Sequence, residues 1–235
     1  PSIGLGNFTW DWIYADYPRV RLAPSLLPTI RGAYAKASMA LRLPMSGGFE
    51  SFSNVRDIPF IARHAHRSRE EVCKLLKIPA DKPIVLSSFG GFGLAGIDTE
   101  VLSKLKKYSV LITAMTPLQR VKKDTPPAER KGSLVTINEE AMYNLGVRYE
   151  DLVGASEAVV TKPGYGIISE CIANDAAILY TPRGHFPEYD VLVDEMPKYA
   201  RSALINHDDL LAGKWEGAID KLLAQPKLKK KPETN

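Results

Sequence analysis

The sequence contains few of the residues from which disulfides and metal sites are built. Its 235 residues include only two cysteines and four histidines. It has no Asp-x-Asp motif and no His/Cys cluster, so we expect neither a metal nor any other cofactor. Cys73 and Cys171 fall on separate predicted helices, which favours free, buried thiols in a reducing, cytoplasmic compartment.

Long hydrophobic runs are also missing. A membrane-spanning helix needs about 20 consecutive apolar residues, and no segment reaches that length. The sequence therefore predicts no transmembrane segment, and no signal peptide is apparent. The chain starts directly at a strand-like segment, Ser2–Gly6, so we expect it to be a fragment of a longer protein that lacks most of its N-terminal domain.

Charge of one sign is not strongly in excess. The net charge is only +4, which predicts no nucleic-acid partner. Part of it comes from the segment Lys227–Pro232, which we expect to be a frayed, solvated tail. A second basic cluster spans residues 63–69. We interpret it as solvated surface, with weak attraction to anionic ligands or lipid headgroups as the alternative.

Two familiar nucleotide-binding motifs are absent. No Gly-x-Gly-x-x-Gly run follows a strand and opens directly into a helix, and no glycine loop ends in Lys-Ser or Lys-Thr. The first absence argues against a plain dinucleotide-binding domain, and the second against a nucleoside-triphosphate loop of the P-loop type.

Short apolar runs instead alternate with amphipathic stretches from Lys82 onward, a pattern typical of a parallel sheet covered by helices. The predicted strands are Ile84–Ser87, Val110–Thr113, Leu134–Ile137, Ala158–Thr161, Ala177–Tyr180 and Ala203–Ile205. The predicted helices are Arg69–Leu76, Asp98–Lys106, Tyr149–Gly154, Ile167–Asn174, Tyr189–Tyr199 and Asp208–Leu223. The fold class is therefore α/β, with a Rossmann-like doubly wound parallel sheet.

Residues 1–80 do not repeat this pattern. They show one short strand, an aromatic segment at Asn7–Tyr14 and a long helical stretch at Ser25–Leu41. One strand is too little sheet for a separate core. The aromatic segment is expected to pack at a domain interface, with an aromatic platform for an acceptor as the alternative. We predict a partial N-terminal domain and linker at 1–80, a ligand-binding domain at 81–226 and a basic tail at 227–235.

A glycine turn follows the predicted strand Ala158–Thr161. Lys162-Pro163-Gly164-Tyr165-Gly166 leads into a helix, and the first-turn amides of a helix bind phosphate because they lack backbone partners and the helix dipole favours an anion. Ser169 and Glu170 follow, where a hydroxyl and a carboxylate are available to a bound ribose. The alternative is that Gly164 and Gly166 only close the turn with positive φ angles.

A second glycine turn follows the predicted strand Ile84–Ser87. Ser88-Phe89-Gly90-Gly91-Phe92-Gly93 would let a backbone approach a ligand closely and form an anion-binding nest. Two such turns at the carboxyl ends of strands in one sheet favour a shared ligand crevice. A flexible loop is the alternative.

Along the chain, the glycine turn at Ser88–Gly93, the glycine turn at Lys162–Gly166 and an acidic turn at Glu188 follow one another. In this order they resemble the C-terminal, nucleotide-sugar-binding half of glycosyltransferases with the GT-B fold. The chain resembles in particular the cell-wall N-acetylglucosaminyltransferase type and the glycosyltransferase-like region of plant L-arabinokinases. The segments Asn7–Tyr14, Thr161–Glu170 and Tyr180–Asp190 carry the second resemblance, which covers nearly the whole chain.

The resemblance implies a role for each turn in holding a nucleoside-diphosphate sugar. Backbone amides would cradle the diphosphate at Gly164, Tyr165, Gly166 and Ile167, and Glu170 would bind the ribose hydroxyls. The second turn would meet the diphosphate at Ser88, Gly90 and Gly91. The acidic turn would hold sugar hydroxyls at Glu188 and Tyr189, since carboxylates accept hydrogen bonds from vicinal hydroxyls.

Two further positions depart from the family pattern or add to it. Lys162-Pro163 stands where many relatives carry His-Gly or Ser-Gly, and the lysine would add charge to a phosphate contact. His185 is a candidate donor contact, although a lone histidine beside a turn is more often a surface or capping residue. The catalytic base stays unassigned, because in this family it usually lies in the N-terminal domain.

The resemblance predicts a glycosyltransferase, or its donor-binding half, that binds a nucleoside-diphosphate sugar of the uridine type and transfers the glycosyl group to the hydroxyl of an unknown acceptor. This chain alone is expected to be inactive. Whether it forms a homo-oligomer is left open. The alternatives are a non-catalytic nucleotide-sugar-binding or regulatory module and a nucleotide-sugar epimerase.

Overall fold

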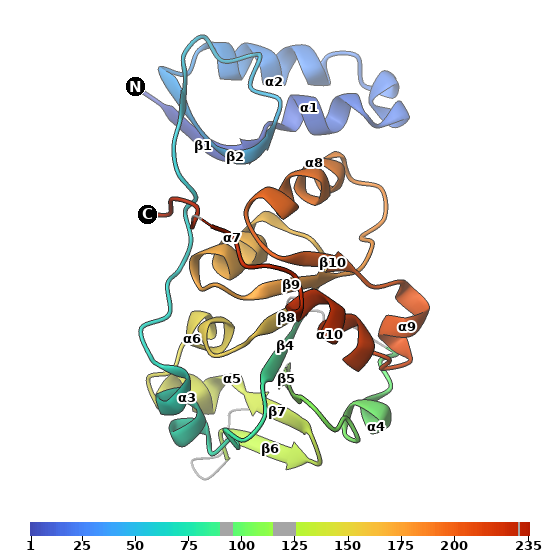
Figure 1. Ribbon diagram of the computed structural model, residues 1–235. Helices are drawn as coiled ribbons and strands as arrows, with labels where there is room; N and C mark the ends of the chain where they lie inside the picture. The colour runs from blue at the N-terminus through green and yellow to red at the C-terminus, as the bar shows by residue number, and fades with distance from the viewer. Residues whose placement is uncertain (90–95, 115–125, 230) are drawn as a thin grey trace. The chain divides into compact units, whose positions relative to one another are not determined.

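The computed structural model describes residues 1–89, 96–114, 126–229 and 231–235. They form two compact units (Figure 1). Unit 1 comprises Pro1–Ala62, Arg183–Lys198 and Pro232–Asn235, and unit 2 comprises Arg63–Pro182 and Tyr199–Lys231. Within the described ranges, no helix is both long and apolar enough to cross a membrane.

Unit 1 is built on a parallel sheet of three strands in the order β1-β2-β3. Its strands are β1 (Ile3–Phe8), β2 (Met39–Gly47) and β3 (Val55–Asp57), and its helices are α1 (Trp10–Ala15), η1 (Pro18–Leu22), α2 (Leu26–Ala35), α8 (Pro187–Glu195) and η2 (Met196–Lys198). Helix α8 packs on β2. The expectation of one strand and too little sheet for a core in residues 1–80 is wrong, because Ile13, Ala40 and Met45 are buried in this unit.

The long helix predicted at Ser25–Leu41 is also wrong in its second half. Helix α2 ends at Ala35, and the chain then enters β2, whose Met39 and Ala40 align with Ile3 and Gly4 of β1. The apolar spacing of this stretch suits a helix locally, but pairing with β1 decides its conformation.

The last residues of the chain lie beyond the segment Lys227–Pro232 that is expected to fray, and they pair with residues near Phe60. Thr234 forms a parallel bridge with Phe60, and the amide of Asn235 donates to the Phe60 carbonyl at 2.9 Å. The Asn235 side-chain oxygen also accepts from the amide of Ala62 at 2.8 Å. These contacts lie within unit 1 and fix the last residues of the chain.

Unit 2 contains a sheet of seven strands in the order β10-β9-β8-β4-β5-β7-β6. Every neighbouring pair is parallel except β6 and β7. The strands are β4 (Ile84–Ser88), β5 (Ser109–Ala114), β6 (Ala128–Lys131), β7 (Leu134–Asn138), β8 (Ala158–Thr161), β9 (Ala177–Tyr180) and β10 (Ser202–Leu204). The predicted doubly wound α/β sheet is confirmed, with an antiparallel edge strand that the sequence did not indicate.

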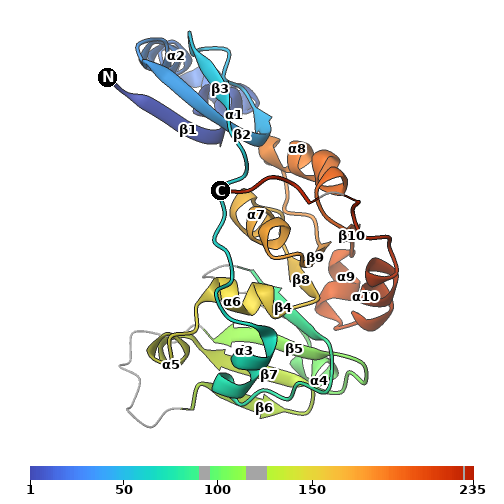
Figure 2. The ribbon, with the colours of Figure 1, turned by 60° about the vertical axis from the view of Figure 1, so that its left-hand side comes forward.

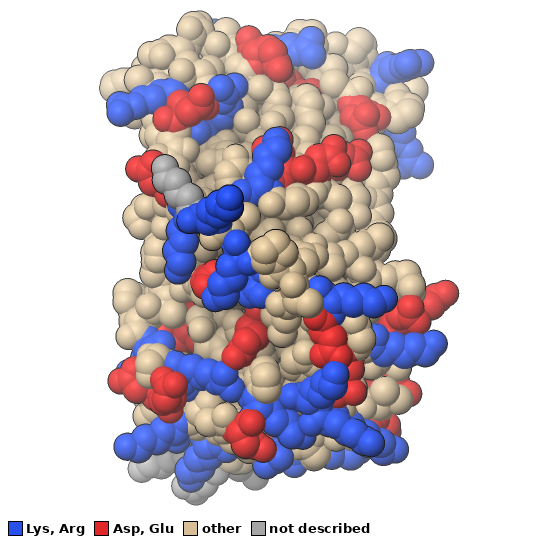
Figure 3. Space-filling model, viewed as in Figure 1, with Lys and Arg blue, Asp and Glu red and all other residues tan. Residues whose placement is uncertain are grey.

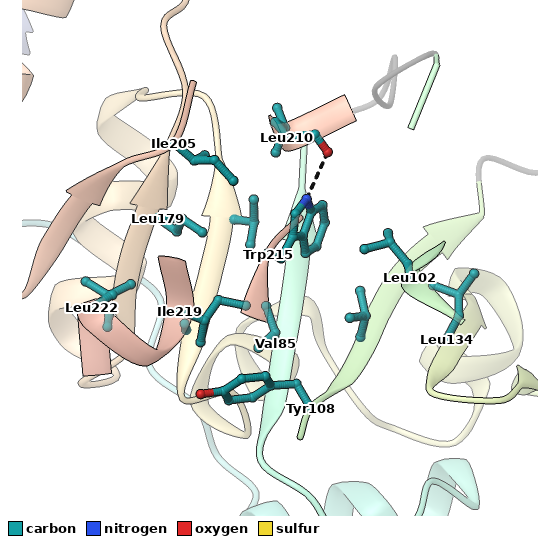
Figure 4. Close-up of a cluster of buried hydrophobic side chains, with 14 residues drawn as sticks. Val85, Leu102, Tyr108, Leu134, Leu179, Ile205, Leu210, Trp215, Ile219 and Leu222 are labelled. Atoms are coloured by element: carbon teal, nitrogen blue, oxygen red, sulfur yellow. Dashed lines mark hydrogen bonds between the residues drawn. The ribbon is translucent and has the colours of Figure 1, made fainter. Parts of the chain in front are cut away.

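Helices cover both faces of this sheet (Figure 2). They are α3 (Arg69–Leu76), α4 (Thr99–Leu102), α5 (Glu139–Asn144), α6 (Tyr149–Gly154), α7 (Tyr165–Ala173), α9 (His207–Leu211) and α10 (Glu216–Leu223). On one face, α4, α9 and α10 bury a core around Trp215, whose indole N–H donates to the Leu210 carbonyl at 2.9 Å (Figure 4). On the other, α6 packs against both α3 and α7.

The helix predicted at Asp208–Leu223 is in fact two helices, α9 and α10. Gly213 lies between them with φ of +68°, and a Cβ atom there would lie 3.0 Å from Val101 Cγ1. The backbone therefore requires glycine at this break. Helix α5 and strand β6 were not predicted.

Residues 63–80 belong to unit 2, where α3 packs on α6. The division into domains at residues 80 and 226 stays a prediction.

Candidate functional site

The two predicted glycine turns leave adjacent strands of unit 2. Strand β4 ends at Ser88 and β8 at Thr161, and these two residues are register partners. Strands β5 and β7 lie on one side of β4, and β8, β9 and β10 on the other, so the strand order reverses between β4 and β8. Open α/β sheets bind ligands outside the carboxyl ends of the strands at such a switch point.

Hydrogen bonds tie the ends of these strands together. The hydroxyl of Thr161 donates to the Ser88 carbonyl at 2.5 Å, and the phenol of Tyr149, at the start of α6, donates to Ser88 Oγ at 2.7 Å. Burial raises the pKa of Tyr149 to about 12, so this phenol stays a neutral donor. Ser88 itself is buried, and Gly90 and Gly91 lie outside the described residues.

Helix α7 begins in the glycine turn after β8 without a side-chain cap. Its N-cap is Gly164, with φ of −153° and ψ of 144°. Side chains of Ser68, Asp98, Asn138 and Asn206 cap four other helices of the unit. No side-chain hydrogen bond caps the start of α7, where the positive end of the helix dipole favours an anion. Lys162 is exposed beside this helix start.

The backbone conformation at position 166 does not require glycine. It lies in the first turn of α7 and is not among the described glycines with positive φ. A Cβ atom at Gly166 would meet nothing within 4 Å. Gly164, by contrast, is in extended backbone, so the interpretation that both glycines supply positive φ is wrong. The missing side chain leaves open space at the start of the helix.

Glu170 lies one turn further along α7, on the same face as Gly166, because residues i and i+4 of a helix lie one above the other. Helical side chains lean toward the N-terminus, so the Glu170 carboxyl group leans toward the open turn. Ser169 is buried and its hydroxyl donates to the Gly166 carbonyl at 2.9 Å. Of these two candidates, Ser169 is engaged within its own helix, and Glu170 stays a predicted ligand contact.

Arg63 binds the carboxylate of Glu170, a contact that the sequence did not indicate. Its Nε and Nη2 atoms lie 2.6 and 2.5 Å from Glu170 Oε1, and its Nη1 lies 3.3 Å from Glu150 Oε2. Both carboxylates are buried. Burial raises the pKa of Glu170, and the Arg63 guanidinium opposes that rise.

The basic cluster at residues 63–69 is therefore not simply solvated surface. Besides Arg63, Arg69 pairs with Glu157 at 2.6 Å, and Arg67 Nε donates to the Gly146 carbonyl at 2.9 Å. In the view of Figure 3, acidic side chains lie among the basic ones. The spacing of basic residues gave no signal for these partners, which lie between 79 and 107 positions away in the sequence.

The remaining predicted residues lie in unit 1. Glu188 is buried at the start of α8 and accepts from Asn7 Nδ2 at 2.8 Å and from Arg183 Nη1 at 3.4 Å. His185 Nε2 lies 2.6 Å from Asp16 Oδ2. Tyr189 is half-buried, and burial raises the pKa of its phenol. The predicted site residues thus fall into two groups, one in each unit.

The aromatic segment Asn7–Tyr14 is half strand and half helix. Trp12 packs so tightly on Gly47 that a Cβ atom there would lie 2.4 Å from the indole. Trp10 is 46% exposed and stacks on Tyr14 at 5.3 Å. A cavity of about 400 Å³ between α1 and α2 is lined by Trp10, Tyr14, Thr29, Ile30, Ala33 and Tyr34. Among the described residues, no group of His, Cys, Asp and Glu is arranged to hold a metal.

The sheet with its switch point, together with the three-stranded unit, has the fold of GT-B glycosyltransferases. Solved structures with this fold include spinosyn forosaminyltransferase SpnP (TM-score 0.58, 10% identity) and a glycosyltransferase of kitacinnamycin (TM-score 0.57, 15% identity). The matches cover 95% and 96% of this chain, but only 61% and 63% of the two structures. A UDP-glucosyltransferase from Polygonum tinctorium gives a TM-score of 0.54 at 13% identity, over 91% of this chain and 51% of that structure.

Among curated proteins, the chain is similar to L-arabinokinase of Arabidopsis thaliana, at 26% identity over 227 residues. The alignment covers 95% of this chain and 20% of the relative, so the chain spans about a fifth of that protein's length. No protein-family model matches. The resemblance to GT-B glycosyltransferases and L-arabinokinases that the sequence predicted is confirmed.

Proposed function

We propose that this chain binds a nucleoside-diphosphate sugar at the carboxyl ends of β4 and β8, and that the protein to which it belongs transfers the sugar to an acceptor hydroxyl. The observation that carries the proposal is the start of α7. Its amides have no side-chain cap, Gly166 leaves open space there, and Glu170 lies on the same helix face one turn on.

Each part of this arrangement suits one part of the ligand. Uncapped amides and the positive end of the helix dipole favour a diphosphate, and exposed Lys162 adds a positive charge nearby. A carboxylate accepts hydrogen bonds from the vicinal hydroxyls of ribose. Ser88, Gly90 and Gly91 are proposed to meet the diphosphate from the neighbouring turn, and Tyr165 and Ile167 to add their amides.

One structural neighbour supports the proposed uridine preference. One solved structure with the same fold is a UDP-glucosyltransferase. The sequence-based expectation that Glu188, Tyr189 and His185 contact the sugar stays a prediction. Amides and a helix dipole are able to stabilise the leaving diphosphate, so no metal is invoked for that step.

A second candidate function is a non-catalytic nucleotide-sugar-binding module. It is favoured by the match to a protein named as a kinase, of which the chain spans about a fifth. The two candidates differ in turnover. Both bind the donor, but only a transferase releases free UDP when an acceptor is present.

The test uses a matched pair of glycines. Gly166 is the second residue of α7 and Gly217 the second of α10, both are exposed, and a Cβ atom at either meets nothing within 4 Å. Alanine and valine at the two positions should therefore change stability by similar amounts, below about 1 kcal/mol. UDP affinity, measured by calorimetry, should fall about tenfold or more for Gly166→Val and stay unchanged for Gly217→Val.

If Gly166→Val is folded and binds UDP as tightly as the parent chain, the diphosphate is not at this helix and the proposed site is wrong.

A further inference from the structure

Arg63 contacts Glu170, one of the residues proposed to hold the donor, through two of its nitrogen atoms. Nε and Nη2 both meet Oε1 of Glu170, at 2.6 and 2.5 Å, and Nη1 reaches Oε2 of Glu150 at 3.3 Å. A guanidinium holds a carboxylate in a fixed plane, unlike an ammonium, which acts as a point charge. Within the described residues, the two contacts of Arg63 to the Glu170 carboxylate fall on one oxygen, Oε1.

The backbone that carries Arg63 is itself fixed on unit 2. Asn174, at the end of α7, donates to the Arg63 carbonyl at 3.0 Å and accepts from the amide of Ala65 at 2.7 Å. The amides of His66 and Arg67 donate to Asp151 Oδ1 at 2.8 and 3.1 Å. Arg63 therefore starts from an anchored segment, and its guanidinium is held between α6 and α7.

Burial alone would work against the role of Glu170 as an acceptor. Burial disfavours the charged form of a carboxylic acid and raises its pKa, and an opposite charge nearby counters this. Glu170 is only 7% exposed, and Arg63 is the cation that opposes the rise in the pKa of its carboxyl group. A protonated Glu170 would lose acceptor capacity toward two adjacent hydroxyls.

We propose that Arg63 is a positioning residue for the donor site: it fixes Glu170 through Oε1, so that Oε2 faces the open turn and accepts from the ribose hydroxyls. The inference rests on the proposed nucleotide-sugar function. Arg63 itself contacts Glu170 and Glu150 rather than the ligand, so it acts on recognition of the ribose and not on recognition of the diphosphate.

The experiment measures the contribution of the ribose hydroxyls directly. Calorimetric titrations compare UDP with 2′,3′-dideoxy-UDP, for the parent chain and for Arg63→Ala. In the parent, loss of the hydroxyls should weaken binding by about tenfold or more. In Arg63→Ala this ratio should fall to within about twofold, while the affinity for the dideoxy compound stays close to that of the parent.

Two variants separate positioning from general destabilisation. Arg69→Ala breaks a comparable pair, with Glu157 at 2.6 Å on the same unit, and should leave the ratio at the parent value. Arg63→Lys keeps the charge without the planar fork and should restore the ratio only in part. It also serves as the test variant if Arg63→Ala does not fold.

The outcomes distinguish this inference from the proposed function. A parent chain that binds neither compound contradicts the proposed function, and the inference falls with it. A parent that prefers UDP over the dideoxy compound, with the same ratio kept in Arg63→Ala, overturns the inference alone. Tighter UDP binding by Arg63→Ala also overturns it, because the arginine would then compete with the ribose for Glu170.

Discussion

Asn7 and Glu188 are 181 positions apart, and the Asn7 side-chain amide donates to Glu188 Oε1 at 2.8 Å. Both side chains are buried in unit 1. This hydrogen bond joins the end of β1 to the start of α8, and it occupies one of the two oxygens of a carboxylate predicted to hold sugar hydroxyls. Residues from distant parts of the sequence thus meet at the carboxyl end of β1.

Asn7→Ala should therefore destabilise unit 1. Removing the donor leaves a buried, charged acceptor short of a partner, which costs about 1–3 kcal/mol. Urea unfolding followed by circular dichroism measures the loss. The double variant Asn7→Ala with Glu188→Gln should recover part of it, because a neutral amide loses less than a carboxylate when the Asn7 donor is missing. Equal stability of Asn7→Ala and the parent would contradict a structural role for this bond.

The stability of the chain should depend on pH through Glu170. Burial raises the pKa of its carboxyl group above the ordinary value of 4.5, so the folded state holds this proton at a higher pH than the unfolded chain does. The contribution of this group to the free energy of unfolding is present below 4.5 and is lost as pH rises through the folded pKa. The contribution of Glu170 to the urea midpoint should fall as pH rises from 4 to 7, and Glu170→Gln should remove this pH-dependent contribution. Identical pH profiles for the two proteins would refute it.

Neither cysteine should react with thiol reagents in the folded protein. Cys73 and Cys171 are buried and free, and burial raises the pKa of both thiols, so little thiolate is available for attack. A colorimetric disulfide reagent should label neither thiol under native conditions and both in denaturant. Fast labelling of Cys171 without denaturant would show that α7 opens locally.

Trp215 should be the most costly tryptophan to truncate. It is fully buried at the centre of the core formed by α4, α9 and α10, and its N–H has a partner in Leu210. Trp215→Leu is expected to cost about 3 kcal/mol or more through lost burial and cavity formation. Trp10→Leu, at a site that is 46% exposed, should cost well under half of that in the same urea experiment. Equal losses would mean that the core is not packed around Trp215.

Much of unit 2 was predictable because its central strands are short and buried. Ala158–Thr161 and Ala177–Tyr180 have the predicted bounds, since buried parallel strands appear in sequence as continuous apolar runs. Unit 1 was not predictable in this way. No glycine or proline separates the end of α2 at Ala35 from the start of strand β2 at Met39. Only pairing with β1 reveals this strand.

The candidate site shows the same limit. The glycine turn before α7 is local, so its position could be predicted from consecutive residues. The partners of Glu170 and Glu188 are not local: Arg63 lies 107 positions from Glu170. A single sequence holds no signal for such pairs, because any exposed arginine or asparagine fits the composition equally well.

The central claim is that the start of α7 binds a nucleoside diphosphate. It is tested most directly by calorimetric titration of the chain with UDP, with ADP and NAD as controls, repeated on Glu170→Ala. The account predicts binding of UDP in preference to both controls and weaker binding by the variant. No binding of any of the three nucleotides, by a chain that circular dichroism shows to be folded, would contradict it.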